Sequence, residues 1–167
     1  MANKDHSLAH DVLEILVKDS KITAEEIGIM LDAPVEDIKN CIKELENNGT
    51  IVKYNTLINW DKTDREYVEA LIEVKVTPQR DQGFDAIAER IYKFDEVTSV
   101  YLMSGDYDLC VTVEGKTMRE VALFVAQKLS TLDSVLSTAT HFILKKYKVE
   151  GIVLEKDEKD RRQAITL

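Results

Sequence analysis

The sequence predicts an α+β protein in which a helical domain comes before a domain of four strands and two helices. Within residues 9–47, apolar residues recur three and four positions apart, which is the period of amphipathic helices. Residues 67–144 read in order as strand, helix, strand, tight turn, strand, helix and strand, the order of a split β-α-β pattern. We therefore expect a first domain at 1–60, a second at 61–154 and a charge-balanced tail at 155–167.

Two helices are expected at the start of the first domain. The second of them begins at Thr23, which forms a capping box with Glu26, while Ile22 and Ile27 have the spacing of a hydrophobic staple. Gly28 inside this helix indicates close approach to a neighbour, since glycine there otherwise costs about 1 kcal/mol relative to alanine. The first helix is expected at 9–18, where one face carries Ala9, Val12, Leu13, Leu16 and Val17.

A third helix follows a tight turn that ends at Pro34, a residue suited to the first helical position. Gly49 ends the helix as a left-handed cap, and its buried stripe consists of Val35, Ile38, Ile42 and Leu45. Three short helices with a tight turn between the second and third form the helix-turn-helix arrangement, whose third helix lies in the major groove of DNA. Residues 50–58 are then an extended segment, which we expect to be a connector strand.

The outward face of the third helix supplies candidates for contact with double-stranded DNA. Lys39 and Lys43 lie one helical turn apart and could reach phosphates. Asn40, between them, could read the edge of an adenine. Lys53 in the extended segment completes the candidate set.

Charge opposes DNA binding in this first domain. The chain carries a formal net charge of −9, and residues 1–60 hold 6 lysines and no arginine against 11 acidic residues, a net charge of −5. Glu36, Asp37 and Glu44 even share the outward face of the third helix. Neutralisation of phosphate by lysine and arginine supplies most non-specific DNA affinity. The local arrangement of the few lysines must therefore offset the repulsion between this acidic domain and DNA.

Alternating apolar residues predict the strands of the second domain. Strands are expected at 67–76 and 97–103, with a helix near 84–92 between them. Gly105 favours a hairpin turn before a return strand that carries alternate apolar residues from 107 to 113. Thr117 and Glu120 predict a second capping box, followed by a last strand at 135–144 that residues 145–154 extend. The buried side of the helix between them is expected to include Val121, Ala122, Val125 and Leu129.

Neither the cysteines nor the hydropathy points to another class of protein. Cys41 and Cys110 stand alone, without the spacing of a zinc site or a disulfide framework. The longest apolar run, at 121–126, is far shorter than the roughly 20 residues that a membrane helix needs. We expect a cytoplasmic protein without membrane contact, cofactor, metal or catalytic residues.

Four segments carry a resemblance to a known family. They read IKELENNGTI at 42–51, VKY at 52–54, GDYD at 105–108 and STATHFIL at 137–144. In their order and spacing the chain resembles the Lrp/AsnC family, the leucine-responsive or feast/famine regulators, over about residues 8–150. The resemblance implies a winged helix-turn-helix domain in front of a ferredoxin-like β-α-β-β-α-β domain of the RAM, ACT-like type.

The resemblance also implies a function and a site. It implies a DNA-binding transcriptional regulator whose second domain forms homodimers, which close into octamers in many members, and senses a small metabolite, an amino acid. Hairpin amides can hold the carboxylate of such an effector, while Asp106 or Asp108 can pair with its ammonium. By position, the effector contacts are Ser104, Gly105, Asp106, Tyr107 and Asp108, with Thr138 and Thr140 from the late strand.

Two alternatives remain open from the sequence. Family members carry arginines along the third helix where this chain has none, so a second hypothesis is a sensor or assembly module that does not bind DNA. A third is an enzyme subunit like the sirohaem decarboxylases, which resemble the same two-part family and need histidines near a large pocket. The chain offers His6 and His10, one helical turn apart, and His141, which we expect to be structural on the strand face that carries Val135.

Overall fold

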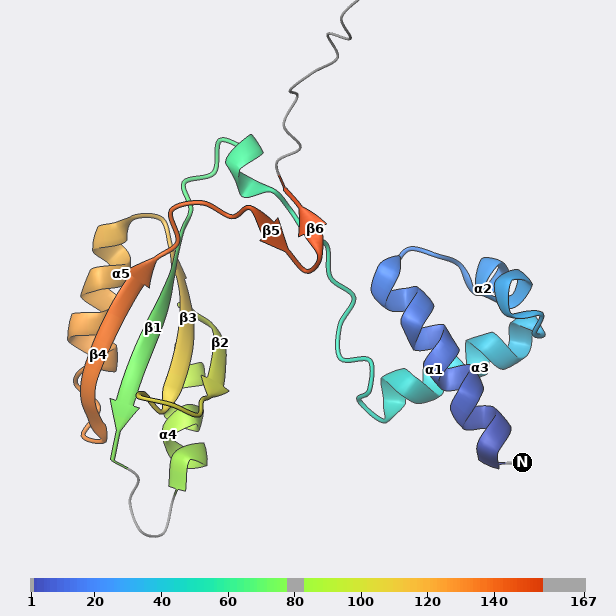
Figure 1. Ribbon diagram of the computed structural model, residues 1–167, viewed down its shortest axis with the longest axis horizontal. Coiled ribbons are helices and arrows are strands. Elements are labelled where there is room, and N and C mark those ends of the chain that lie inside the picture. Colours follow the sequence, from blue (N-terminus) through green and yellow to red (C-terminus); the bar gives the residue numbers. More distant parts are fainter. Residues whose placement is uncertain (1, 78–82, 155–167) are drawn as a thin grey trace, which may run out of the picture. The chain divides into compact units, whose positions relative to one another are not determined.

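Two compact units make up the chain, and they divide between Ile58 and Asn59. The computed structural model describes residues 2–77 and 83–154, and each unit is described by itself (Figure 1). The tail expected at 155–167 lies outside the described residues.

The first unit consists of three helices, α1 (Ala2–Lys18), α2 (Ala24–Leu31) and α3 (Val35–Asn47). Their shared core is small and contains Val12, Leu16, Ile27, Ile38 and Leu45. The predicted capping box is confirmed, since the Glu26 amide donates to Thr23 Oγ1 at 3.2 Å and the Thr23 amide donates to Glu26 Oε2 at 2.9 Å. Close approach at Gly28 is also confirmed, because a Cβ there would lie 2.9 Å from the Ala33 carbonyl oxygen.

Three details of the first unit differ from the sequence prediction. The side chain of Val17 is 85% exposed, because it lies about 100° around α1 from Leu16 and the small core covers only a narrow stripe. Pro34 is the N-cap of α3 rather than its first helical residue. The connector strand expected at 50–58 does not form, since the described part of this unit contains no strand with which its backbone could pair.

The second unit contains a four-stranded antiparallel sheet in the order β2-β3-β1-β4. Its elements are β1 (Val68–Val76), α4 (Gly83–Tyr92), β2 (Val97–Leu102), β3 (Leu109–Gly115), α5 (Met118–Phe124), a π-helical turn η2 (Val125–Leu129) and β4 (Val135–Phe142). Because β3 pairs between β1 and β2, the split β-α-β order predicted from the sequence is confirmed.

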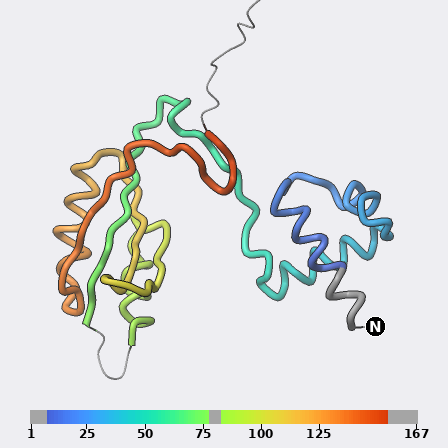
Figure 2. Tube along the Cα trace, viewed as in Figure 1, coloured from blue at the N-terminus to red at the C-terminus, as the bar shows by residue number. Residues whose placement is uncertain are grey.

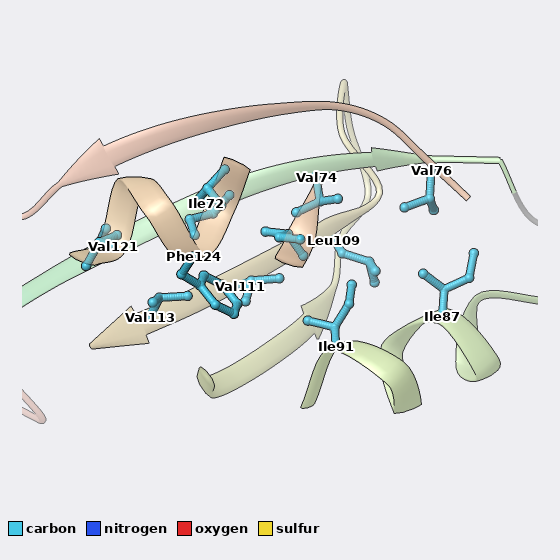
Figure 3. Close-up of a cluster of buried hydrophobic side chains, with 13 residues drawn as sticks. Ile72, Val74, Val76, Ile87, Ile91, Leu109, Val111, Val113, Val121 and Phe124 are labelled. Atoms are coloured by element: carbon cyan, nitrogen blue, oxygen red, sulfur yellow. The ribbon is translucent and has the colours of Figure 1, made fainter. Parts of the chain in front are cut away.

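One face of this sheet packs on α4 and α5 and contains the core (Figure 3). Along β1 the alternate residues Ala70, Ile72, Val74 and Val76 are buried, as the alternation predicted. Ile72 faces the helices with no exposed surface, and full burial of such a side chain stabilises the fold by about 1.5–3 kcal/mol. The sheet is therefore a rigid support for the loops at its ends.

The segment of α5 and η2 differs from the prediction at three points. Ala122 is exposed, because it lies about 100° around α5 from the buried Val121 and so turns away from the sheet. The second capping box is only half formed: the Glu120 amide donates to Thr117 Oγ1 at 3.2 Å, but Glu120 Oε2 accepts from the Lys116 amide at 2.8 Å. The helix then widens into η2, which the sequence did not predict.

Residues 145–154 do not extend β4. They form a separate two-stranded hairpin, β5 (Lys148–Val149) and β6 (Ile152–Val153), because Glu150 and Gly151 adopt left-handed φ angles of 48° and 80° and reverse the chain. The end of this hairpin lies beside the start of the second unit (Figure 2), where the Asn59 side-chain amide donates to the Leu154 carbonyl at 3.4 Å. A short 3₁₀ turn, η1 (Trp60–Lys62), follows Asn59.

Candidate functional site

The loop between β2 and β3 contains five of the predicted effector contacts, residues 104–108. The Met103 amide donates to the Asp108 carbonyl at 2.8 Å and so closes the loop. Gly105 has a φ of 144°, which side chains rarely adopt, although a Cβ there would meet no atom within 4 Å. The backbone conformation, and not lack of space, therefore requires glycine at this position.

Asp108 attaches this loop to β1. Its amide donates to the Val74 carbonyl at 3.1 Å, and its carboxylate Oδ2 accepts from the Val76 amide at 2.8 Å. The pairing of β1 with β4 shifts register between Lys75 and Val76, so the carboxylate satisfies an amide next to a bulge. Ser104, Gly105 and Asp106 are exposed, and Tyr107 is half-buried.

The two threonines lie on the helix-covered face of β4. Thr138 pairs with Val74 and Thr140 with Ile72, both of which point into the core. Thr138 Oγ1 lies 3.4 Å from Ser130 Oγ at the end of η2. Val74 of β1 lies between the loop and the threonines. Its carbonyl accepts from the Asp108 amide, and its partner residue on β4 is Thr138.

The opposite face of the sheet is not covered by any described helix of the second unit. Leu71 and Tyr101 are 39% and 56% exposed there, and His141 Nε2 lies 3.4 Å from Glu73 Oε1. Val135 is not on this face, because the bulge next to Val76 turns it toward the core, so its predicted grouping with His141 is wrong.

A polar cluster lies on this uncovered face, near the start of β1 and the end of β3. The Tyr67 hydroxyl lies 2.6 Å from Glu69 Oε2 and 3.1 Å from Glu114 Oε1, and Lys146 pairs with Glu69. Burial, and then these two carboxylates, raise the pKa of Tyr67 far above its ordinary value. The hydroxyl therefore stays protonated and acts as a donor to the carboxylates.

The third helix exposes all of its predicted DNA contacts, but one is already paired. Lys39 Nζ lies 2.9 Å from Glu25 Oε1 of α2, and this ion pair raises the pKa of Lys39 and lowers that of Glu25. The side chains of Asn40 and Lys43 have no hydrogen-bond partner within the part of the chain that the structure describes. Lys53 is exposed beside Tyr54, whose hydroxyl donates to Glu46 Oε1 of α3 at 2.9 Å and so fixes the start of the extended segment.

The family model described as "Lrp/AsnC ligand binding domain" matches residues 69–153. A protein named as an uncharacterised HTH-type transcriptional regulator, YugG of Bacillus subtilis (strain 168), is 52% identical over 157 residues, which are 93% of this chain and 95% of that protein. The chain belongs to the Lrp/AsnC family. It is an HTH-type transcriptional regulator with a metabolite-sensing domain, and the resemblance seen in the sequence is confirmed.

Solved structures agree with the fold of this Lrp/AsnC regulator. Escherichia coli AsnC superposes with a TM-score of 0.68 at 18% identity over 86% of this chain and 94% of that chain. The transcriptional regulator NMB0573 of Neisseria meningitidis, solved as an L-Met complex, gives a TM-score of 0.70 at 21% identity, with 85% of this chain and 91% of that chain covered. The helix-turn-helix and ferredoxin-like architecture is thus shared.

Two cavities of the second unit lie away from the 104–108 loop. One of 440 Å³ is lined by Arg65, Tyr67 and Lys116 among others, and one of 270 Å³ lies beside α5. Neither has a residue of 104–108 or either threonine in its wall. In a single copy of the regulator, the loop is therefore an exposed projection at the edge of the sheet.

The two histidines whose side chains are described, His10 and His141, belong to different units. His10 Nδ1 lies 4.0 Å from Glu14 Oε1 on the exposed side of α1, and the side chain of His6 lies outside the described residues. In residues 8–77 and 83–154, whose side chains are described, no three His, Cys, Asp or Glu side chains gather in a way that could hold a metal. No helix of the same residues is long and apolar enough to cross a membrane.

Sequence reasoning missed two contacts that define the site. The Glu25 partner of Lys39 and the Val76 amide bound by Asp108 both come from other elements, so no local pattern indicates them. The one available signal was the acidic first turn of α2, which placed Glu25 on the exposed side of the neighbouring helix.

Proposed function

We propose that this Lrp/AsnC regulator binds double-stranded DNA through α3 and an amino acid through the 104–108 loop, as a homodimer paired by the uncovered sheet face. The observation that carries the effector proposal is the attachment of Asp108 to β1. It holds the loop in one place while the backbone of Ser104 and Gly105 and the carboxylate of Asp106 stay exposed.

The exposed groups of the loop match the two charged ends of an amino acid. Loop N–H groups can donate hydrogen bonds to a carboxylate, and Asp106 can pair with an ammonium. Asp108 is the less suitable partner, because one of its oxygens already accepts the Val76 amide. Tyr107, Thr138 and Thr140 complete the proposed contacts, and the L-Met complex of NMB0573 supports this class of effector.

Association of copies supplies what one copy lacks. The exposed Leu71 and Tyr101 give the uncovered sheet face an apolar surface that a second sheet could cover. The loop has no opposite wall in a single copy, so an effector there would gain one from a second dimer. This geometry favours assembly beyond the dimer, such as an octamer, in response to effector.

The DNA contacts proposed are Lys43, Asn40 and Lys53, with Lys39 available only after it leaves Glu25. The first unit of each copy, called the head from here on, thus offers only a few lysines to phosphates. When several heads of one oligomer bind one duplex, each bound head raises the effective concentration of the others and so the overall affinity.

The test is fluorescence anisotropy with promoter DNA at low salt, with and without amino acids. Lys43→Gln should weaken binding and reduce the slope of log K against log salt by about 1. Glu25→Gln should strengthen binding, because it releases Lys39 and removes a negative charge. Lys21→Gln is the matched control, since Lys21 is an exposed lysine of the same unit outside α3. Equal effects of the Lys43 and Lys21 substitutions would refute the assignment to α3.

A sensor module without DNA binding is the second candidate. The Lys39–Glu25 ion pair and the acidic side chains of α3 favour it. This candidate expects no anisotropy change for the wild-type chain at any salt concentration and none for Glu25→Gln. Effector binding would be retained, so titration with amino acids distinguishes the two functions from a misfolded protein.

A further inference from the structure

His141 and Glu73 form a pair on the uncovered sheet face. Glu73 lies on β1 and His141 on the neighbouring strand β4, with 3.4 Å between His141 Nε2 and Glu73 Oε1. Both side chains are accessible in one copy, with exposed fractions of 58% for His141 and 38% for Glu73. Leu71, the residue opposite His141 on β1, is part of the apolar surface of the same face. The pair therefore lies where a second sheet would cover it.

Among the described residues of this face, His141 alone changes its charge between about pH 6 and pH 8. Cys110 lies opposite Glu73 on β3, and burial, followed by the charge of Glu73, raises the pKa of its thiol, which stays protonated. Tyr67 stays protonated as well. Carboxylates and lysines keep their charges near neutral pH, and those that share the face with Glu73 are Glu69 with its partner Lys146, Glu114, and Lys75.

Covering this face by a second copy would change the energy of the pair. A carboxylate that loses its water is strongly disfavoured unless a cation accompanies it. Lys75 forms no ion pair with Glu73 within the part of the chain that the structure describes, so His141 is the partner that can supply the charge. A neutral imidazole does not offset the carboxylate, whereas an imidazolium does. Protonation of His141 should therefore stabilise the paired state more than the single copy.

We propose that the homodimer of this regulator takes up protons on His141 as it forms, so that the copies associate more tightly as pH falls from about 8 to about 6. The inference rests on the proposed function, in which two copies pair by this face. A two-fold dimer contains the pair twice, so uptake is at most about two protons per dimer. Averaged over two pH units, uptake of only about half a proton per dimer already changes the Kd about tenfold.

The experiment is sedimentation equilibrium of the effector-free full chain at about pH 6, 7 and 8 and one ionic strength. We expect the dimer to dissociate with a Kd at least about tenfold lower at the lowest pH than at the highest. Where the wild-type dimer is too tight to dissociate, the same comparison is made in the Leu71→Ala background, which weakens the same face.

The outcomes separate this inference from the homodimer itself. An equal Kd at the three pH values, for a dimer that Leu71→Asp disrupts, would overturn the proton uptake and leave the proposed pairing in place. Absence of a dimer at every pH would refute the pairing, and the proton uptake with it.

Two substitutions assign the proton to the pair, and neither side chain belongs to the core of the unit. His141→Gln should give a Kd that is the same at all three pH values. In Glu73→Gln, protonation of His141 would bury a cation without its carboxylate, so the pH dependence should disappear or reverse. Wild-type pH dependence in either variant would overturn the proposal.

His10 of α1 supplies the matched control. Its Nδ1 lies 4.0 Å from Glu14 Oε1, so it is also a histidine beside a glutamate, but it belongs to the first unit. Protonation of His10 reduces the negative charge of the chain by as much as protonation of His141 does. His10→Gln should keep the wild-type pH dependence of the Kd. If it removes as much of that dependence as His141→Gln, acid acts by reducing repulsion between whole chains, and the assignment to the sheet face fails.

Discussion

Replacement of Asp108 by alanine should destabilise the second unit of this regulator through one hydrogen bond. The Asp108 carboxylate accepts the Val76 amide at 2.8 Å, and Val76 is only 5% exposed. The substitution removes a charged acceptor and leaves a backbone amide without a partner at the bulge of β1. A hydrogen bond to a charged group contributes about 1.5–3 kcal/mol, so we expect a loss of roughly 2 kcal/mol in the free energy of unfolding.

Urea unfolding followed by tryptophan fluorescence measures this loss. The chain has one tryptophan, Trp60, and it lies in the second unit, where its ring stacks under Arg65 at 4.4 Å. The midpoint should fall without a change of slope, because the surface exposed on unfolding stays the same. Asp108→Asn keeps a neutral acceptor and should lose about half as much.

The matched control is Asp106→Ala, which removes an exposed carboxylate from the same loop. Its unfolding free energy should stay within about 0.5 kcal/mol of the wild type. If Asp108→Ala and Asp106→Ala lose the same stability, the loop is not held by the Val76 contact, and the separation of a positioning Asp108 from an effector-binding Asp106 fails.

Three further perturbations test other parts of the structure. Gly28→Ala should destabilise the first unit by roughly 1–3 kcal/mol in urea unfolding followed by circular dichroism, because its Cβ would lie 2.9 Å from a backbone oxygen and this clash outweighs the gain in helix propensity. Leu71→Asp should shift sedimentation toward monomers, while the same change at exposed Ile29 of α2 should not. The hydrogen bond from Lys128 lowers the pKa of Glu96 below its ordinary value of 4.5, so the pair contributes stability above pH 4.5 that is lost as pH falls through the folded-state pKa. Glu96→Gln should therefore flatten the acid side of the stability profile in this window.

The strands and caps of this regulator follow local rules, which is why the sequence predicts them. The alternation in β1 and the capping box at Thr23 each depend on residues within a few positions of one another. The predictions are wrong where burial or strand pairing depends on an element that is distant in the sequence. Val17 is helical as expected but exposed, since burial depends on how far α2 and α3 extend over α1. Residues 145–154 have strand character but form their own hairpin instead of continuing β4.

The sequence predicts which segment forms the candidate site, but it does not predict the contacts that this segment makes. The sequence placed 104–108 in a tight turn, but the roles proposed for Asp106 and Asp108 differ because of an amide of β1, more than 30 positions away along the chain. The 270 Å³ cavity beside α5 had no signal in the sequence, because its wall combines residues of the π-helical turn η2 with Glu96 of the segment before β2.

The salt dependence of DNA binding should report how many first units touch the duplex, because each of them has few lysines available for phosphates. With Lys39 held by Glu25, each head offers Lys43 and Lys53 to phosphates. Two cations per head and two heads give about four neutralised phosphates and a slope near −3.6 in log K against log salt, whereas eight heads would give a slope near −14. A single copy would give about −1.8, because its two lysines neutralise only about two phosphates, too few contacts for useful affinity at physiological salt. If the sheet face brings copies together as proposed, DNA binding by a chain with this acidic first unit depends on that face, so oligomerisation and DNA binding should be lost together.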